Sequence, residues 1–323
     1  MEIAGKQIKP PIAIAPMAGV TDYPYRQILR ELGAELIYTE MVSSKGLVYG
    51  SKRTEELLDY NRQDDGYINV QVFGEEPEFI VKASQKIEEE YQPDFIDLNM
   101  GCPAPKIVKN GAGSALMKTP SLVKKIVTSM VENLETPVTV KIRAGWDEDN
   151  INGVEIAQIA EEAGAQLVAV HGRTRGQFYS GQVDYDIIKQ VKEAVAIPVI
   201  GNGDIFDLES AEKMFDKTNC DGIMVARGIQ GNPWLIKRLM KYFGEGIRIP
   251  QPTPQEKIEM ALYHLDKAVD YYGEEIAIPK MRKHISWYIK GLKNSTYVKD
   301  EINKLKKKEA VVDTLKKYKK LFN

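Results

Sequence analysis

The sequence predicts an α/β fold, a (β/α)8 barrel followed by a small C-terminal all-helical domain. Eight short runs rich in apolar and β-branched residues recur within the first 230 residues, and their starts lie 24 to 42 residues apart. Each interval has room for one helix and two loops, which is the spacing of repeated β-α units. A chain of 323 residues also has room for a barrel of about 250 residues and a small second domain.

The predicted strands and helices alternate throughout the barrel. The strands occupy residues 12–17, 36–42, 68–74, 95–101, 137–143, 167–173, 198–204 and 222–228. Helical patterns fill residues 25–32, 78–91, 122–134, 154–163 and 187–194. An open doubly wound sheet would instead carry a glycine-rich phosphate-binding turn after its first strand. The turn found there, Pro16-Met17-Ala18-Gly19, does not match Gly-x-Gly-x-x-Gly, so the closed barrel is favoured.

The C-terminal part reads as a separate set of helices. Residues 234–243 form the last predicted barrel helix, and the glycines and prolines of residues 244–252 indicate a linker. Thr253-Pro254-Gln255-Glu256 then has the pattern of a capping box with proline at the first helical position. Helical periodicity continues through residues 258–272, 280–291, 298–308 and 311–322. We therefore divide the chain into a catalytic barrel, residues 1–243, and a helical domain, residues 244–323.

The charge of the chain is distributed unevenly. Residues 280–323 hold 14 Lys and Arg against 4 Asp and Glu, a net charge of +10. The remainder holds 30 basic and 42 acidic residues, a net charge of −12. A basic C-terminal region on an acidic body suggests a polyanionic partner such as nucleic acid. Lysine-rich helices that are only solvated give the same count, so charge alone leaves both readings open.

Composition and cysteine content restrict the class of protein. Hydrophobic residues make up 43% of the chain and charged residues 28%, which is typical of soluble globular proteins. The N-terminus does not resemble a signal peptide, and no apolar run approaches the roughly 20 residues of a membrane helix. Two cysteines far apart in sequence argue against a disulfide framework. We expect a cytoplasmic monomer with no membrane segment and no metal site.

Polar side chains are expected to converge at the C-terminal ends of the strands. Alternate residues of a strand face opposite sides, which places Asp97 and Asn99 on the interior face of the fourth strand. Lys141, Gln71 and His171 hold interior positions near the ends of three other strands. Because the reactive groups of this fold lie at these strand ends, their convergence predicts a functional site.

The loops after the seventh and eighth strands predict a phosphate site. They contain Gly201-Asn202-Gly203-Asp204 and Ala226-Arg227-Gly228, whose glycines allow backbone N–H groups to approach phosphate oxygens. Lys141 and Gln71 are then placed to address the polar edge of a flat cofactor ring, such as that of a flavin. His171 either bonds the phosphate or the substrate, or is an interior histidine whose hydrogen bonds are satisfied.

At this point several motifs carry a family resemblance. They are Pro16-Met17-Ala18-Gly19-Val20-Thr21-Asp22, Gln71-Val72-Phe73-Gly74, Asp97-Leu98-Asn99-Met100-Gly101-Cys102-Pro103, Val140-Lys141-Ile142-Arg143, His171-Gly172-Arg173-Thr174-Arg175-Gly176-Gln177, Asn202-Gly203-Asp204-Ile205 and Met281-Arg282-Lys283-His284. Together they resemble the tRNA-dihydrouridine synthases, most closely the bacterial B-type branch. One departure is Ala226, where that family commonly has glycine.

The resemblance implies a flavin-dependent oxidoreductase that reduces the C5=C6 bond of selected uracils in tRNA. FMN would be the bound cofactor, reduced by NADPH or NADH. By similarity, the FMN contacts fall on Pro16, Met17, Ala18, Gln71, Lys141, His171, Asn202, Gly203, Asp204, Ala226 and Arg227.

The same resemblance makes Cys102 the acid that protonates C5 of the uracil. A thiol with a pKa of about 8.5 remains protonated near neutral pH, whereas an ordinary carboxylic acid does not. Asn99 would orient the base or the flavin. Cys220, which precedes the eighth strand, lies at the opposite end of the barrel and is expected to be structural. Asp97 is left without an assigned role beyond support or packing.

A uracil must leave its stack to reach a barrel mouth, so we expect contacts to the surrounding tRNA. The predicted tRNA-contacting residues are Asn99, Lys106, Lys109, Arg173, Arg175, Gln177, Tyr179, Lys280, Arg282 and Lys283. The sequence is also compatible with two alternatives. One is an FMN barrel oxidoreductase of a small pyrimidine, similar to dihydroorotate dehydrogenase, and the other is an RNA-binding barrel without catalytic activity.

Overall fold

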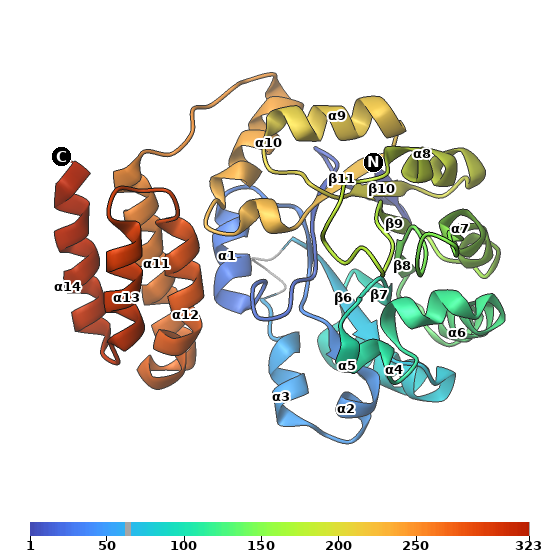
Figure 1. Ribbon diagram of the computed structural model, residues 1–323. Helices are drawn as coiled ribbons and strands as arrows, with labels where there is room; N and C mark the ends of the chain where they lie inside the picture. The colour runs from blue at the N-terminus through green and yellow to red at the C-terminus, as the bar shows by residue number, and fades with distance from the viewer. Residues whose placement is uncertain (62–65, 323) are drawn as a thin grey trace.

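The computed structural model describes residues 1–61 and 66–322, and its first part is a closed parallel β-barrel (Figure 1). The barrel strands are β3 (Ile12–Ile14), β4 (Leu36–Tyr38), β6 (Tyr67–Phe73), β7 (Phe95–Met100), β8 (Val138–Arg143), β9 (Val168–His171), β10 (Val199–Asn202) and β11 (Gly222–Val225). Pairing of β4 with both β3 and β6 closes the ring. A short strand, β5 (Val42–Ser43), runs along the end of β6. The predicted (β/α)8 barrel is confirmed.

Helices surround the barrel in the order that the sequence predicts. They are α1 (Tyr23–Glu31), α4 (Pro77–Tyr91), α6 (Pro120–Asn133), α7 (Gly153–Glu162), α8 (Tyr185–Ala194), α9 (Leu208–Thr218) and α10 (Trp234–Glu245). α1, α6 and α8 begin two residues earlier than predicted, and in α1 and α8 an aspartate caps the first turn. Asp22 accepts from the N–H of Tyr25, and Asp184 accepts from those of Asp186 and Ile187.

The loops contain short elements that the sequence did not reveal. At the mouth these include the helices α2 (Ser44–Val48), α3 (Lys52–Glu55) and α5 (Pro105–Val108). At the other end, β1 (Glu2–Ile3) and β2 (Lys6–Gln7) form an antiparallel hairpin. These pieces are too short to leave a period in the sequence, so packing determines their conformation.

All barrel strands except β8 end earlier than predicted, and the early ends of β9, β10 and β11 shape the site. β9 ends at His171 because the N–H of Arg173 turns back to the carbonyl oxygen of His171. β10 ends at Asn202 because Gly203 and Asp204 both take positive φ values, 139° and 49°. β11 ends at Val225. Residues at these positions therefore lie on loops that curve over the mouth.

The barrel interior changes character along its axis. Toward the N-terminal ends of the strands it is apolar, with Tyr38, Phe95, Ile200 and Met224 buried together. Toward the C-terminal ends it is polar and also buried; the side chains here are Asn69, Gln71, Asp97, Asn99 and Thr139. Buried polar groups are costly unless they are hydrogen-bonded, so this upper layer requires a complete network.

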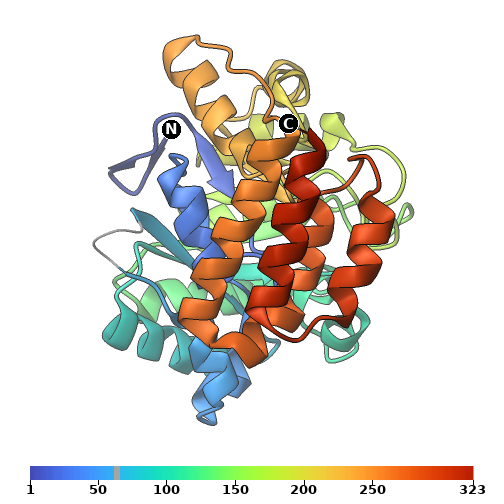
Figure 2. The same ribbon diagram turned by 90° about the vertical axis from the view of Figure 1, so that its left-hand side faces the viewer.

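The C-terminal helices form a bundle beside the barrel (Figures 1 and 2). They are α11 (Pro254–Tyr272), α12 (Glu274–Tyr288), α13 (Ser295–Lys304) and α14 (Lys308–Lys319), and they share an apolar core of their own. The predicted capping box at Thr253 is present. α12 begins six residues before the predicted start at residue 280 and contains Pro279 near its N-terminus.

The bundle is anchored on the barrel through α1. Tyr25 of α1 stacks on His264 of α11 with ring centroids 4.9 Å apart, and Figure 2 looks onto the bundle with α11 and α14 side by side. Burial lowers the pKa of His264 well below the ordinary histidine value, so this contact is made by a neutral imidazole. Among the described residues, no helix combines the length and apolar character needed to cross a membrane.

Candidate active site

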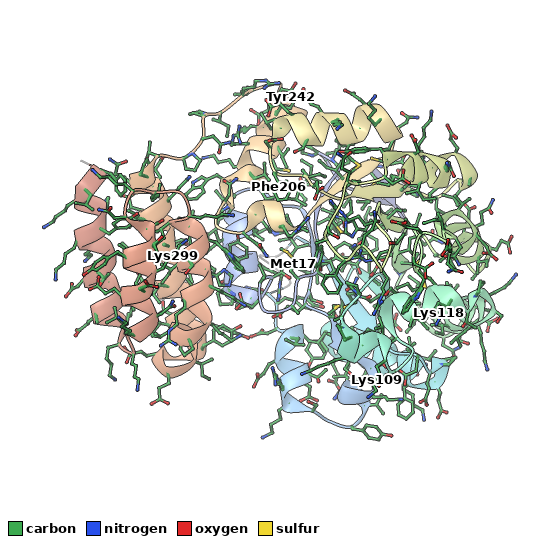
Figure 3. The ribbon with its side chains drawn as sticks, viewed as in Figure 1. Met17, Lys109, Lys118, Phe206, Tyr242 and Lys299 are labelled. Carbon is green, nitrogen blue, oxygen red and sulfur yellow. The ribbon has the colours of Figure 1, made fainter. Side chains whose placement is uncertain are left out.

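The C-terminal mouth of the barrel opens into a cavity of about 430 Å³, a volume typical of small-molecule sites. Every barrel strand contributes a lining residue at or just beyond its end. Fourteen residues predicted from the sequence line this cavity: Pro16, Met17, Ala18, Gln71, Asn99, Cys102, Lys141, His171, Tyr179, Asn202, Gly203, Asp204, Ala226 and Arg227. Figure 3 shows Met17 near the centre of the mouth and Phe206 above it.

One side of the cavity is an anion-binding cradle. The carboxylate of Asp204 accepts from Arg173 Nη1 at 3.0 Å and from Arg227 Nη2 at 2.8 Å. One carboxylate between two guanidiniums leaves a net positive charge. Because the carboxylate of Asp204 is occupied by the two arginines, this residue can bind a ligand through its backbone N–H. A Cβ at Gly203 would lie 2.6 Å from Val183, so glycine is needed where this loop approaches the segment that precedes α8.

Lys141 stands on the floor of the cavity. Its Nζ donates to Asn202 Oδ1 at 3.1 Å, and Asn202 in turn donates to the carbonyl oxygen of Met224. Desolvation, with a smaller contribution from Arg143, lowers the pKa of Lys141 to about 8. An anionic ligand at this position would therefore be bound by an ammonium group that is only marginally stable in its absence.

His171 is a neutral imidazole in this setting. Its side chain is buried, and desolvation followed by the positive charges of Arg143 and Lys141 lowers its pKa well below the ordinary value. A neutral imidazole both donates and accepts a hydrogen bond, so it can bond a phosphate oxygen without adding charge.

The interior aspartate that the sequence left unassigned begins a chain of hydrogen bonds. Asp97 accepts from Thr139 Oγ1 and from Gln71 Nε2, each at 2.7 Å. Gln71 Oε1 accepts from Asn99 Nδ2 at 2.6 Å. Asn99 Oδ1 accepts from the backbone N–H groups of Gly101 and Cys102 at 3.1 and 2.9 Å. The loop carrying Cys102 is thus tied to the barrel interior.

The Cys102 thiol lies on the loop after β7 and lines the same cavity as Asp204 and Arg227. Burial raises its pKa, and nearby Arg143 and Lys141 oppose this increase only in part. The carbonyl oxygen of Cys102 accepts from Ser114 N and Oγ at 3.1 and 2.9 Å, which holds the loop from its other side. The thiol is therefore protonated at neutral pH.

Arg143 belongs to one of the sequence motifs, but it was not among the residues predicted for the site. It is 2% exposed and donates to three carbonyl oxygens: Nε to Gly101 at 2.7 Å, and Nη1 to Thr174 at 2.8 Å and Phe178 at 2.9 Å. It therefore joins the Cys102 loop to the loop after β9. Strand alternation was the available signal, but it does not reveal these partners.

Exposed aromatic rings rim the cavity beside the cradle. Phe178, Tyr179 and Phe206 are 41%, 47% and 46% exposed. The guanidinium of Arg227 lies 4.9 Å from the Tyr179 ring centre and 5.7 Å from that of Phe206, and Arg143 lies 5.6 Å from Tyr179. Of these rings, only Tyr179 was predicted from the sequence. Such a rim can stack a flat ligand.

The other predicted contact residues of the barrel lie outside the cavity lining. Lys106 and Lys109 are exposed on and just after α5, and Figure 3 shows Lys109 and Lys118 on the same side of the mouth. Arg175 and Lys118 both stack on Trp146, at 4.6 and 4.7 Å from its ring centre.

Two of the residues predicted to contact tRNA on the loop after β9 are used within the protein. Gln177 accepts from the N–H of Thr174. Arg173 is 2% exposed and, besides Asp204, donates to the carbonyl oxygens of Ser180 and Gly181. This differs from the predicted direct contact of Arg173, because burial commits its guanidinium to shaping the loop and the cradle.

The predicted residues of α12 divide between the mouth and the bundle. Lys280 lies 4.0 Å from Asp22 and 4.2 Å from the ring centre of Tyr272, and a Cβ on Gly19 would lie 2.8 Å from Lys283 Nζ. Both lysines thus border the loop after β3. Arg282 instead donates to the carbonyl oxygen of Leu305 in the bundle.

Within residues 1–61 and 66–322 there is no group of three or more His, Cys, Asp and Glu side chains placed to hold a metal ion. Both cysteines are free. Cys220 is buried at the N-terminal side of β11, away from the cavity.

Known proteins are similar to this sequence over most of its length. A probable tRNA-dihydrouridine synthase of Rickettsia bellii is 41% identical over 98% of this chain and 96% of its own length. The tRNA-dihydrouridine synthase B of Pasteurella multocida is 41% identical over 94% of this chain and 91% of its own. That of Shewanella oneidensis is 42% identical over 90% of this chain and 89% of its own.

A comparison of structures supports the fold alone, and a family model supports the family. A chain in the crystal structure of the Amycolatopsis orientalis BexX/CysO complex superposes with a TM-score of 0.51 at 14% identity, covering 78% of this chain and 98% of that chain. The model of the family described as "Dihydrouridine synthase (Dus)" matches residues 13–323. This match spans the barrel mouth, the thiol loop and the helical bundle, and the chain belongs to the dihydrouridine synthase family.

Proposed function

We propose that this protein is a tRNA-dihydrouridine synthase that uses FMN and NADPH to reduce the C5=C6 bond of uridines in tRNA. We expect it to act as a monomer in the cytoplasm, a compartment whose reducing conditions suit its free cysteines. The observation that carries the proposal is a single cavity lined both by a positive anion cradle and by a protonated thiol.

The residues present fit FMN. The net positive cradle of Arg173, Asp204 and Arg227 suits a phosphate, and the close approach of the Gly203 loop leaves backbone N–H groups to complete it. Lys141 would face the polar edge of the isoalloxazine ring, where a cation favours the reduced, anionic form. When bound, FMN would supply hydride chemistry, taking a hydride from NADPH and passing one to C6 of the uracil.

Cys102 would give the proton to C5. Its raised pKa keeps the proton on sulfur until the substrate arrives. Arg143 and Lys141 then stabilise the thiolate that remains, since both lower the pKa of this thiol. Solvent restores the proton when product leaves, so NADPH and one proton are consumed for each dihydrouridine formed.

The surface around the mouth suits a folded RNA with one extruded base. Tyr179 and Phe178 offer exposed faces for stacking, and Lys106 and Lys109 offer charges to neighbouring phosphates. The basic bundle, with a net charge of +10 over residues 280–323, would contact the body of the tRNA. The two alternatives do not require this combination of an intact thiol and a basic bundle.

The test is a comparison of wild type with Cys102→Ala. Purified wild type should be yellow, release FMN on denaturation and form dihydrouridine in unmodified tRNA. Cys102→Ala should bind FMN and oxidise NADPH but leave the tRNA unmodified, because only the proton donor is removed. A colourless protein that does not take up added FMN would contradict the flavin assignment, and full dihydrouridine formation by the variant would exclude Cys102 as the acid.

A further inference from the structure

Asp97 is a charged residue that the proposed reaction does not use directly. It lies in the middle of β7, is fully buried and does not line the cavity. Its two oxygens are occupied by Thr139 and Gln71, each at 2.7 Å. A carboxylate at this depth costs free energy unless its charge serves a purpose, which raises the question of what it determines.

The direction of the hydrogen bonds answers the question. An ionised carboxylate only accepts, so Gln71 must turn its NH2 group to Asp97 and its oxygen to Asn99. Asn99 must then present its NH2 group to Gln71, which leaves its oxygen for the N–H groups of Gly101 and Cys102. Backbone N–H groups only donate. The Asp97 carboxylate and the N–H groups of Gly101 and Cys102 therefore require the same orientation of the Gln71 and Asn99 side-chain amides.

We infer that Asp97 is a positioning residue for Cys102, because its acceptor-only carboxylate orients the Gln71 and Asn99 amides and thereby holds the Cys102 loop. This inference rests on the proposed role of Cys102 as the acid. Asp97 is one side chain removed from the cavity, and it acts through hydrogen-bond direction rather than by contact with substrate.

The surroundings of Asp97 are consistent with this role. Lys141 of β8 faces it and favours its charged form, while Tyr38 of β4 faces it as a neutral phenol whose pKa is raised well above the usual value, chiefly by desolvation. Thr139 Oγ1 accepts a hydrogen bond from Asn69 Nδ2 at 2.9 Å, so the Thr139 hydroxyl hydrogen is directed to Asp97. The series of hydrogen bonds therefore has a fixed direction at Thr139 and Asp97 as well as at the N–H groups of Gly101 and Cys102.

The substitution Asp97→Asn tests the direction with almost no change in shape. With the Thr139 hydroxyl donating to the new amide oxygen, the new NH2 group meets the NH2 group of Gln71. Reversing Gln71 and then Asn99 would place an NH2 group against the N–H groups of Gly101 and Cys102. We expect amide hydrogen exchange of Gly101 and Cys102 to accelerate about tenfold or more.

A second substitution should reverse the effect. In the double variant Asp97→Asn/Gln71→Glu, the new carboxylate at position 71 accepts from the amide at 97 and from Asn99, which restores the orientation of Asn99. Gln71→Glu is expected to weaken the flavin site, so rescue is measured at the loop. Asp94→Asn is the matched control, because Asp94 precedes the same strand and accepts from Lys6 and the N–H of Ile68 far from Cys102.

The measurements are amide exchange and the alkylation rate of Cys102, made in a Cys220→Ala background so that one thiol reports. Both should increase in Asp97→Asn, return toward wild type in the double variant and stay unchanged in Asp94→Asn. Unchanged loop exchange in Asp97→Asn, or no rescue, would overturn the inference. These readouts need neither flavin nor tRNA, so failure of the proposed function would show separately as absent dihydrouridine formation by wild type.

The wild-type protein offers a test that does not depend on the folding of a variant. Desolvation raises the pKa of Asp97 to about 6, against the opposing effects of Thr139, Gln71 and Lys141. Lowering the pH from 7.5 to about 5 should protonate Asp97 and release the Gly101 and Cys102 amides relative to others in β7. Protection that stays constant across this range, after correction for intrinsic exchange, would also overturn the inference.

Discussion

Replacing Arg143 with methionine should separate the stability of this protein from the geometry of its thiol. Methionine keeps much of the buried volume but removes the donors to Gly101, Thr174 and Phe178. Arg143→Met therefore disconnects the Cys102 loop from the loop after β9, while the strand that carries residue 143 remains in the barrel.

The expected loss of stability is modest because two effects oppose each other. Three hydrogen bonds from a charged donor contribute about 5–9 kcal/mol. Burial of the guanidinium, which lowers its pKa to about 10, costs about 3 kcal/mol, and that cost disappears in the variant. Two of the three carbonyl oxygens are only partly buried and can bond water. We therefore expect the free energy of unfolding to fall by about 2–3 kcal/mol.

The loss of activity should be larger than the loss of stability. A displaced thiol loop costs on the order of a hundredfold in dihydrouridine formation, because proton transfer requires alignment within a fraction of an ångström. Urea unfolding followed by circular dichroism gives the first quantity, and single-turnover reduction of tRNA uridine by flavin-loaded protein gives the second. Arg143→Lys should keep the charge but still lose most activity, because one ammonium group cannot bridge two loops.

Arg26→Met is the matched control. Arg26 is equally buried and donates to the carbonyl oxygens of Thr21 and Asp59, outside the thiol loop. The free energy of unfolding of Arg26→Met should fall by about as much as that of Arg143→Met, but its activity per folded molecule should stay at the wild-type level. If Arg143→Met and Arg26→Met retain equal activity, the reasoning that assigns Arg143 to loop geometry is wrong.

Three further predictions concern the cofactor and the RNA. FMN affinity, measured by fluorescence quenching, should fall as the pH rises through about 8, where Lys141 loses its proton, and should not change over this range in Lys141→Met. Gly203→Ala should weaken FMN binding about tenfold or more, since a Cβ there meets Val183 at 2.6 Å, whereas Gly246→Ala, with nothing within 4 Å, should leave FMN affinity unchanged. Lys106→Gln combined with Lys109→Gln should reduce the slope of log affinity for tRNA against log salt by about 1–2.

Each of these predictions has a result that would contradict it. A wild-type FMN affinity that is constant from pH 7 to 9.5 would remove Lys141 as a charged contact, and normal FMN binding by Gly203→Ala would remove the cradle. For the RNA contacts, Lys9→Gln combined with Lys237→Gln is the control, because both residues border a groove at the opposite end of the barrel. If log tRNA affinity has the same slope against log salt in both double variants, the effect is a general one of charge and Lys106 and Lys109 are not specific contacts.

The sequence by itself determined the barrel, the strand ends and most of the cavity lining. Period-two alternation placed Gln71, Asn99 and Lys141 on the interior face, and the spacing of the strands placed the glycine loops at the same mouth. The capping box at Thr253 located the start of α11. These features follow from local periodicity and from backbone preferences over a few residues, which a single sequence carries.

Only the tertiary structure decided how the interior polar groups are connected. The hydrogen bonds that begin at Asp97 depend on strand register. The pairing of β7 with β8 aligns Asp97 with Thr139, and the pairing of β6 with β7 aligns Gln71 with Asp97. The burial of Arg173 and the three bonds of Arg143 depend on how the loop after β9 folds back over the mouth. Register and loop closure arise from contacts between residues far apart in the chain, so local periodicity does not encode them.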